Sequence, residues 1–162
     1  MRIYAVADIH SRARRLDMIR ERVRRLEPDV VVVAGDITRY VRPLPVLAVL
    51  NDLPVPVLAV RGNSDLPRTE RLIEHLPNLR ALHLRETEVR GVSFVGLSGA
   101  VPVPFHTRTA WREKTLGRRV GPMIREETVL VTHAPPYGTL DDVFERLGDL
   151  HAGSRQVRDL VL

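Results

Sequence analysis

Four short polar motifs of this chain could do chemistry, and each follows an apolar run. They are Asp8-Ile9-His10, Gly35-Asp36, Gly62-Asn63-Ser64-Asp65 and Thr132-His133. Carboxylate, imidazole and amide groups together bind divalent metal ions that accept both nitrogen and oxygen ligands. Each motif taken alone is more typical of a turn or of a structural histidine than of a metal site. Their order, at the ends of successive apolar runs, favours a metal site.

The apolar runs themselves predict buried β-strands, and amphipathic segments between them predict helices. In an open α/β sheet, ligands bind beyond the carboxyl ends of the strands, which is where the four motifs fall. The segment 80–99 differs, because short strands around a turn at Arg90-Gly91 predict antiparallel pairing. The fold class is therefore α/β with a mixed sheet. The predicted strands are 2–8, 29–36, 55–63 and 127–136, and the predicted helices are 12–27, 44–52, 68–76, 109–121, 141–147 and 154–161.

Length and composition limit the class of protein. The 162 residues predict one domain spanning 1–162, with 44% hydrophobic residues available for a core. The absence of cysteine excludes disulfides and thiolate metal sites. No apolar run approaches the roughly 20 residues of a membrane span, and the first residues do not resemble a signal peptide, so we expect a cytoplasmic protein without membrane association. Lys114 is the one lysine among 25 basic residues, and this bias, with 12 prolines, favours a thermophile or a GC-rich genome.

The net charge of +5 makes nucleic acid a conceivable partner. Many of the arginines, however, lie in the segment 11–28, where Leu16, Ile19 and Val23 recur at helical spacing. These arginines then form the solvated face of an amphipathic helix. Charge alone therefore permits an anionic partner but does not identify one.

The ordered motifs resemble those of the calcineurin-like metallophosphoesterases, and the small prokaryotic phosphodiesterase-like branch in particular. The resemblance covers essentially the whole chain through "ADIH" (7–10), "AGDIT" (34–38), "RGNSD" (61–65) and "VTHAPP" (131–136). It implies a four-layer sandwich of two mixed β-sheets flanked by helices. It also implies a metal-dependent phosphoesterase.

Carried over motif by motif, the resemblance implies two divalent ions. Asp8 and His10 would bind the first, Asn63 and His133 the second, and Asp36 would bridge both. Such a pair holds a hydroxide that attacks phosphorus in line. The donor set suits Mn²⁺, which we expect first, and also Fe²⁺, Zn²⁺ or Ni²⁺.

The residues after Gly62 depart from the family pattern. Ser64 stands where many members have a histidine that assists the leaving group, and serine is not an acid near neutral pH. The resemblance therefore favours phosphodiesters over monoesters. Asn63 and Asp65 are expected to be catalytic, with Asp65 behind the ligands and orienting His10. Asn63, Ser64 and Arg39 are expected to contact the phosphate.

A second departure is the missing Gly-His-x-His motif, which normally gives one ligand to each metal. The sequence ends at "SRQVRDLVL" without it, so the resemblance implies a C-terminally truncated domain that lacks its last strands. An unpaired sheet edge would result, and we expect a homo-oligomer through that edge. His151 is a candidate replacement ligand and His106 a candidate substrate contact, whereas His75 and His83 are expected to be structural.

Three functions remain open from the sequence. The first is a two-metal phosphoesterase acting on a small phosphoester or nucleotide. The second is a non-catalytic member of the fold that binds nucleotide, nucleic acid or a partner protein. The third is simple nucleic-acid binding through arginine, with an affinity that falls steeply with salt. Asp8 and Asp36 argue against the third, because they would repel phosphate unless a cation lay between.

Overall fold

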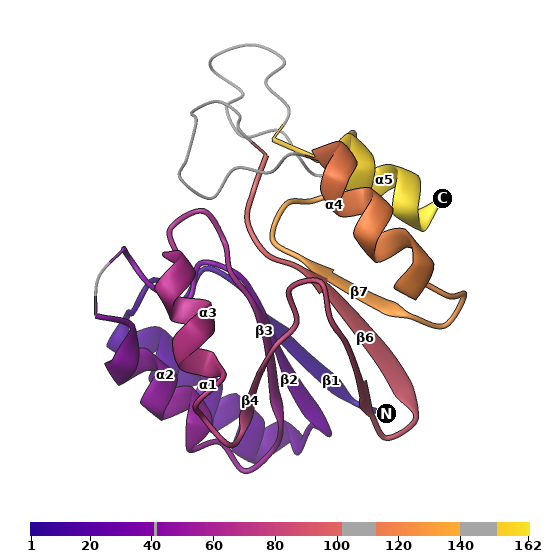
Figure 1. The fold of residues 1–162 in the computed structure, drawn as a ribbon. Helices are drawn as coiled ribbons and strands as arrows, with labels where there is room; N and C mark the ends of the chain where they lie inside the picture. Colours follow the sequence, from indigo (N-terminus) through magenta and orange to yellow (C-terminus); the bar gives the residue numbers. More distant parts are fainter. Residues whose placement is uncertain (41, 102–112, 140–151) are drawn as a thin grey trace.

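The fold consists of two β-sheets between two layers of helices (Figure 1). The computed structural model describes residues 1–40, 42–101, 113–139 and 152–162. The helices are α1 (Ala13–Leu26), α2 (Pro43–Asn51), α3 (Pro67–Ile73), α4 (Glu113–Val120) and α5 (Arg155–Val161), with a short 3₁₀ turn η1 (Gly121–Met123) after α4.

The first sheet is built from the amino-terminal half of the chain. Its order is β1 (Ile3–Val6), β2 (Val30–Ala34), β3 (Val57–Val60) and β4 (Leu79–Ala81), and every pair in it is parallel. Because all strands run the same way, their carboxyl ends meet at one edge. The register aligns Val6 with Val33, so the polar motifs that follow these strands start side by side.

The second sheet contains β5 (Glu86–Val89), β6 (Val92–Leu97) and β7 (Val129–Thr132). Arg90 and Gly91 join β5 to β6 with φ values of 49° and 79°, as a tight hairpin turn with left-handed central residues requires. The β5–β6 pair is antiparallel, whereas β6 and β7 are parallel. The antiparallel pairing expected around Arg90 is therefore confirmed.

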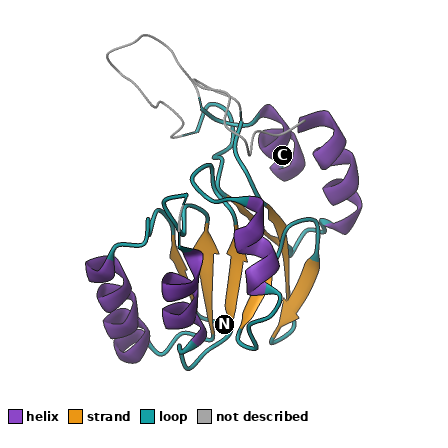
Figure 2. Cartoon of the chain, turned by 60° about the vertical axis from the view of Figure 1, so that its left-hand side comes forward, coloured by secondary structure: helices purple, strands orange, loops and turns teal. Residues whose placement is uncertain are grey.

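Three buried clusters fill the spaces between the four layers. Val31 and Val33 of β2 face the helices α1, α2 and α3, while Val30 and Val32 face the second sheet. A strand that is buried on both faces explains the continuous valine run. Phe94 lies in the cluster between the sheets, and a third cluster joins the second sheet to α4 and α5. Figure 2 shows the helices outside the strands.

The four-layer sandwich is thus confirmed, with one correction. Only the second sheet is mixed, because its β5–β6 hairpin is the one antiparallel pair among the described strands. The first sheet is purely parallel because a helix follows each of β1, β2 and β3 and returns the chain to the opposite end of the sheet. The helix expected at 141–147 lies outside the described residues.

The strand β1 forms one edge of the first sheet. Among the described residues it pairs with β2 alone, and its positions alternate between exposed and half-buried, unlike those of β2 and β3. The exposed apolar side chains include Ile3 at this edge. Within the described residues, no helix has the length and apolar character that crossing a membrane requires.

Candidate metal site

The loops after β1 and β2 continue the pairing of their strands. The amide of Asp8 donates to the carbonyl of Gly35 at 3.1 Å, and that of His10 donates to the carbonyl of Asp36 at 2.9 Å. Asp8, His10 and Asp36 all have left-handed backbone conformations, with φ between 51° and 56°. Such conformations are costly for residues other than glycine and gather at functional sites. Here they turn three potential ligands toward one point.

Asp65 joins the loop after β2 to the loop after β3. It is fully buried, and its carboxylate accepts hydrogen bonds from the amides of Ile37, Thr38 and Gly62 and from the hydroxyl of Thr38, at 2.7–3.0 Å. A carboxylate can leave water only when its charge is satisfied in this way. Asp65 therefore fixes the two loops relative to each other.

Two glycines leave room for the site. A Cβ at Gly35 would lie 2.6 Å from the ring of His133, and a Cβ at Gly62 would lie 2.1 Å from Oδ1 of Asp36. Of the two, Gly35 alone has a positive φ, of 90°. Gly62 is therefore needed for the close approach of Asp36.

The carboxylate of Asp36 lies at the centre of the site and faces two histidines. Its Oδ2 is 3.7 Å from Nε2 of His10, which is itself 3.4 Å from Oδ1 of Asp8. Its Oδ1 is 3.5 Å from Nε2 of His133, which is 3.0 Å from Oδ1 of Asn63. The ligand atoms of Asp8, Asp36 and His133 all lie within 4.8 Å of one another. All five sequence-predicted metal ligands are thus brought together.

Both histidines are held by their other nitrogen. Nδ1 of His133 lies 2.9 Å from the carbonyl of Ala34, which can only accept, so this nitrogen carries the proton. Nδ1 of His10 lies 3.4 Å from Oγ of Ser64, whose hydroxyl donates to the carbonyl of Thr38 at 2.6 Å. In both rings Nε2 is left to face the carboxylates. An acceptor behind the ring is the usual support of a metal-binding histidine.

The donor set fits a metal ion. With Nδ1 protonated, the Nε2 lone pair of His133 faces two oxygen acceptors, of Asp36 and Asn63, and these groups repel one another unless a cation lies between them. A proton on Nε2 is one such cation, and a metal ion that displaces it is the other. The Asp36 side chain is 5% exposed, whereas that of Asp8 is 56% exposed. The site is therefore buried at Asp36 and open to solvent at Asp8.

Two predicted residues lie in places that do not suit their expected roles. Asp65 does not orient His10, because its oxygens are bonded to the two loops; the atom behind His10 is Oγ of Ser64. Complete burial of Asp65 likewise argues against a catalytic contact with substrate. Ser64 is 4% exposed and donates to Thr38, so its hydroxyl supports a ligand rather than facing a phosphate. Arg39 is exposed just beyond the site, as a phosphate contact requires.

The other predicted residues are spread over the chain. His75 is exposed after α3, and His83 follows β4 and bridges to Gly96. His106 and His151 lie outside the described residues.

A polar network next to the site was missed from the sequence. We define the Arg61 network as Arg61, Glu70, Ser98 and His83. Nε of Arg61 donates to Glu70 at 3.0 Å, the hydroxyl of Ser98 donates to the same carboxylate at 2.9 Å, and the amide of Ser98 donates to Nδ1 of His83 at 3.0 Å. The sequence feature that could have predicted this network is an arginine directly after the apolar strand β3. Arginine is seldom buried without a partner, so a paired acidic residue was to be expected there.

The pKa of His83 is lowered, mainly because burial penalises the charged ring. Glu70 opposes this shift, and the nearby Arg61, Arg119 and Arg85 add to it. The folded protein therefore favours a neutral His83. Since Nδ1 accepts from Ser98, the proton of the neutral ring lies on Nε2.

Replacement of Gly62 by alanine tests the close approach at Asp36. Because the new Cβ would lie 2.1 Å from Oδ1 and 2.5 Å from the backbone nitrogen of Asp36, the carboxylate must move. We expect the affinity for Mn²⁺ to fall by at least about 10-fold, as when groups supporting a ligand are lost. Calorimetric titration measures it. Gly121→Ala is the control, because its Cβ would meet only Leu160 at 3.7 Å; equal affinity of the two variants would contradict the assignment.

The lowered pKa of His83 also predicts a pH-dependent stability. Between the lowered folded value and the ordinary value of about 6.5, the unfolded chain binds more protons. This contribution to stability is therefore present above about pH 6.5 and is lost as the pH falls through that window. In His83→Asn, whose amide oxygen can replace Nδ1 as acceptor, urea midpoints should fall less between about pH 7.5 and pH 5 than in the wild type. The exposed His75→Asn variant should match the wild type, and an unchanged pH dependence in His83→Asn would refute the assignment.

Comparison with known proteins identifies the family of this chain. Residues 1–157 match the family model described as the calcineurin-like phosphoesterase superfamily domain. An uncharacterized protein of Methanocaldococcus jannaschii, MJ1162, is 29% identical over 168 residues, with 99% of this chain and 73% of that protein covered. Among solved structures, TT1561 of Thermus thermophilus shares the fold at a TM-score of 0.76 and 18% identity, over 98% of this chain and 75% of that one. A structure described as a novel archaeal phosphodiesterase matches at a TM-score of 0.50 and 19% identity, over 63% of this chain and 61% of that one. The chain belongs to the calcineurin-like phosphoesterase superfamily.

Proposed function

We propose that this protein is a metal-dependent hydrolase that cleaves phosphodiesters in preference to phosphomonoesters at a site for two divalent ions. The observation that carries the proposal is the position of Asp36. Its two oxygens face different histidines, His10 on one side and His133 on the other. A carboxylate divided in this way is suited to bridge two ions about 3.5–4 Å apart.

The protein's own groups divide into two sets of three ligands that share Asp36. Asp8, His10 and Asp36 would hold one ion, and Asp36, Asn63 and His133 the other. When bound, such ions activate water and neutralise charge on the phosphoryl oxygens. The Ser64 hydroxyl and the Ala34 carbonyl hold the histidine rings in position throughout. The exposed side of the site, at Asp8, is where ester and water would enter.

The preference for diesters rests on Ser64. This residue takes the place where many family members have a histidine, and its buried hydroxyl is bonded to Thr38. It therefore supplies no proton to a leaving group. The archaeal phosphodiesterase shares the fold with this chain, which makes the same reaction class a reasonable proposal.

The remaining parts of the proposal concern the metal and the partners. Oxygen and imidazole ligands suit Mn²⁺, with Fe²⁺, Zn²⁺ or Ni²⁺ as alternatives. The substrate would be a small phosphoester or nucleotide held partly by Arg39, in a cytoplasmic setting. The edge strand β1 supports the proposal of a homo-oligomer, because its exposed edge can pair with another chain.

Hydrolysis of bis-p-nitrophenyl phosphate and of p-nitrophenyl phosphate, with and without Mn²⁺, tests the function. We expect metal-dependent turnover, faster on the diester. Asp36→Asn should reduce kcat/KM by at least about 100-fold, because the loss of a residue that only supports a metal ligand already lowers metal affinity or activity by roughly 10–100-fold. Asp17→Asn is the matched control, because this carboxylate on α1 is 74% exposed and away from the site.

The outcomes separate the two candidate functions. Turnover lost in Asp36→Asn but kept in Asp17→Asn supports the enzyme. Absence of turnover with any of the four metals would overturn it and favour the non-catalytic alternative, in which the same fold binds nucleotide, nucleic acid or a partner protein.

A further inference from the structure

The Arg61 network lies directly beside the metal ligands. Arg61 precedes Gly62 and Asn63, and its amide donates to Oγ of Ser98 at 2.9 Å, while the amide of Gly99 donates back to its carbonyl at 2.7 Å. These bonds join the end of β3 to the end of β6. The network therefore lies at the carboxyl ends of the strands, the edge at which α/β sheets bind ligands.

The guanidinium of Arg61 is incompletely satisfied. Its side chain is 11% exposed and Nε is paired with Glu70, but the buried Nη1 has no hydrogen-bond partner among the described residues. A buried charged donor without an acceptor is costly, and such groups are rare in folded proteins. An acceptor placed beside Nη1 would satisfy it.

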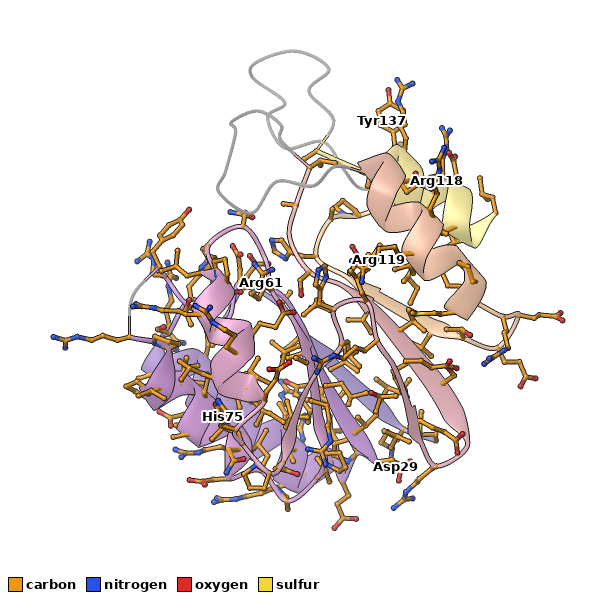
Figure 3. All side chains as sticks on the ribbon, viewed as in Figure 1. Asp29, Arg61, His75, Arg118, Arg119 and Tyr137 are labelled. Carbon is orange, nitrogen blue, oxygen red and sulfur yellow. The ribbon has the colours of Figure 1, made fainter. Side chains whose placement is uncertain are left out.

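Two further donors belong to the same part of the fold. His83 carries its ring proton on Nε2, because Nδ1 accepts from Ser98. Arg119 of α4 is exposed, and its charge, like that of Arg61, lowers the pKa of His83. Figure 3 shows Arg61 and Arg119 in the middle part of the molecule. Glu70 balances one of the two guanidinium charges and leaves the other in excess.

We propose that Arg61, His83 and Arg119 form a subsite that binds a second anionic group of the substrate, a phosphate or a carboxylate, next to the metal ions. Arg61 is two residues from the ligand Asn63, so the two Cα atoms are at most about 7 Å apart. Both residues therefore belong to the same loop after β3. The subsite rests on the proposed phosphoesterase function and would select doubly charged substrates from simple diesters.

Binding of inorganic phosphate to the metal-free full chain tests the subsite without any turnover. EDTA-treated protein is titrated calorimetrically at low salt. Because EDTA removes metal ions, no cation held by Asp8 and Asp36 can attract the anion. Saturable binding by the wild type is expected, weakened at least about 5-fold in Arg119→Gln and in the double variant Arg61→Met/Glu70→Gln, as for the loss of one charged hydrogen bond. The double variant removes both charges of the pair and keeps an acceptor for Ser98.

Arg125→Gln is the matched control, because Arg125 is exposed and paired with Glu86 at 2.7 Å as Arg61 is with Glu70. It should bind phosphate like the wild type. No saturable binding by the wild type would overturn the subsite, as would equal losses in Arg119→Gln and Arg125→Gln. Because no metal is present, these results do not depend on whether the protein is an active esterase.

A second measurement uses the Mn²⁺-loaded protein and two chromogenic diesters. The p-nitrophenyl ester of thymidine 5′-phosphate has no second anion, and its 3′-phosphorylated form has one. We expect the wild type to have a KM at least about 5-fold lower for the second ester, and Arg119→Gln to have nearly equal KM values for the two esters. Equal KM values in the wild type would contradict the subsite while leaving the esterase function intact.

Discussion

The buried carboxylate of Asp65 is the interaction on which the site depends. It accepts four hydrogen bonds from the loops after β2 and β3, and a charge without water requires all of them. Only when these loops are fixed does Asp36 of one loop come close to Asn63 of the other. The geometry of the candidate metal site therefore depends on a residue that is not itself one of the candidate ligands.

The parallel first sheet makes this arrangement possible. Its strands finish at one edge, and backbone hydrogen bonds continue past their ends, so that His10 is joined to Asp36. Left-handed conformations at Asp8, His10 and Asp36 then turn the side chains inward. Strain of this kind persists because the surrounding fold determines it. The glycines at 35 and 62 are the complementary feature, since any side chain there would displace His133 or Asp36.

Much of the fold and the ligand set could be predicted from the sequence, because both depend on periodicity and on strand order. The run of valines in β2 indicated a strand buried on both faces, and Asp8, Asp36 and His133 stood at strand ends. The role of Asp65 could not be predicted, because an aspartate in a turn has the same local pattern whether it faces solvent or the three amide groups of Ile37, Thr38 and Gly62. The Arg61 network depends on contacts between β3, α3 and β6. Such contacts join residues far apart in the sequence, so a local sequence pattern does not predict them. The purely parallel pairing of the first sheet likewise depends on which strands become neighbours.

The proposed function requires that Asp36 bridges two metal ions. Titration of the metal-free protein with Mn²⁺, followed by electron paramagnetic resonance, tests this bridge, because two manganese ions bridged by a carboxylate are magnetically coupled. We expect two ions per chain and the spectrum of a coupled pair, with the coupling lost in Asp36→Asn. A single uncoupled ion at saturation, or a coupled pair that survives Asp36→Asn, would contradict it.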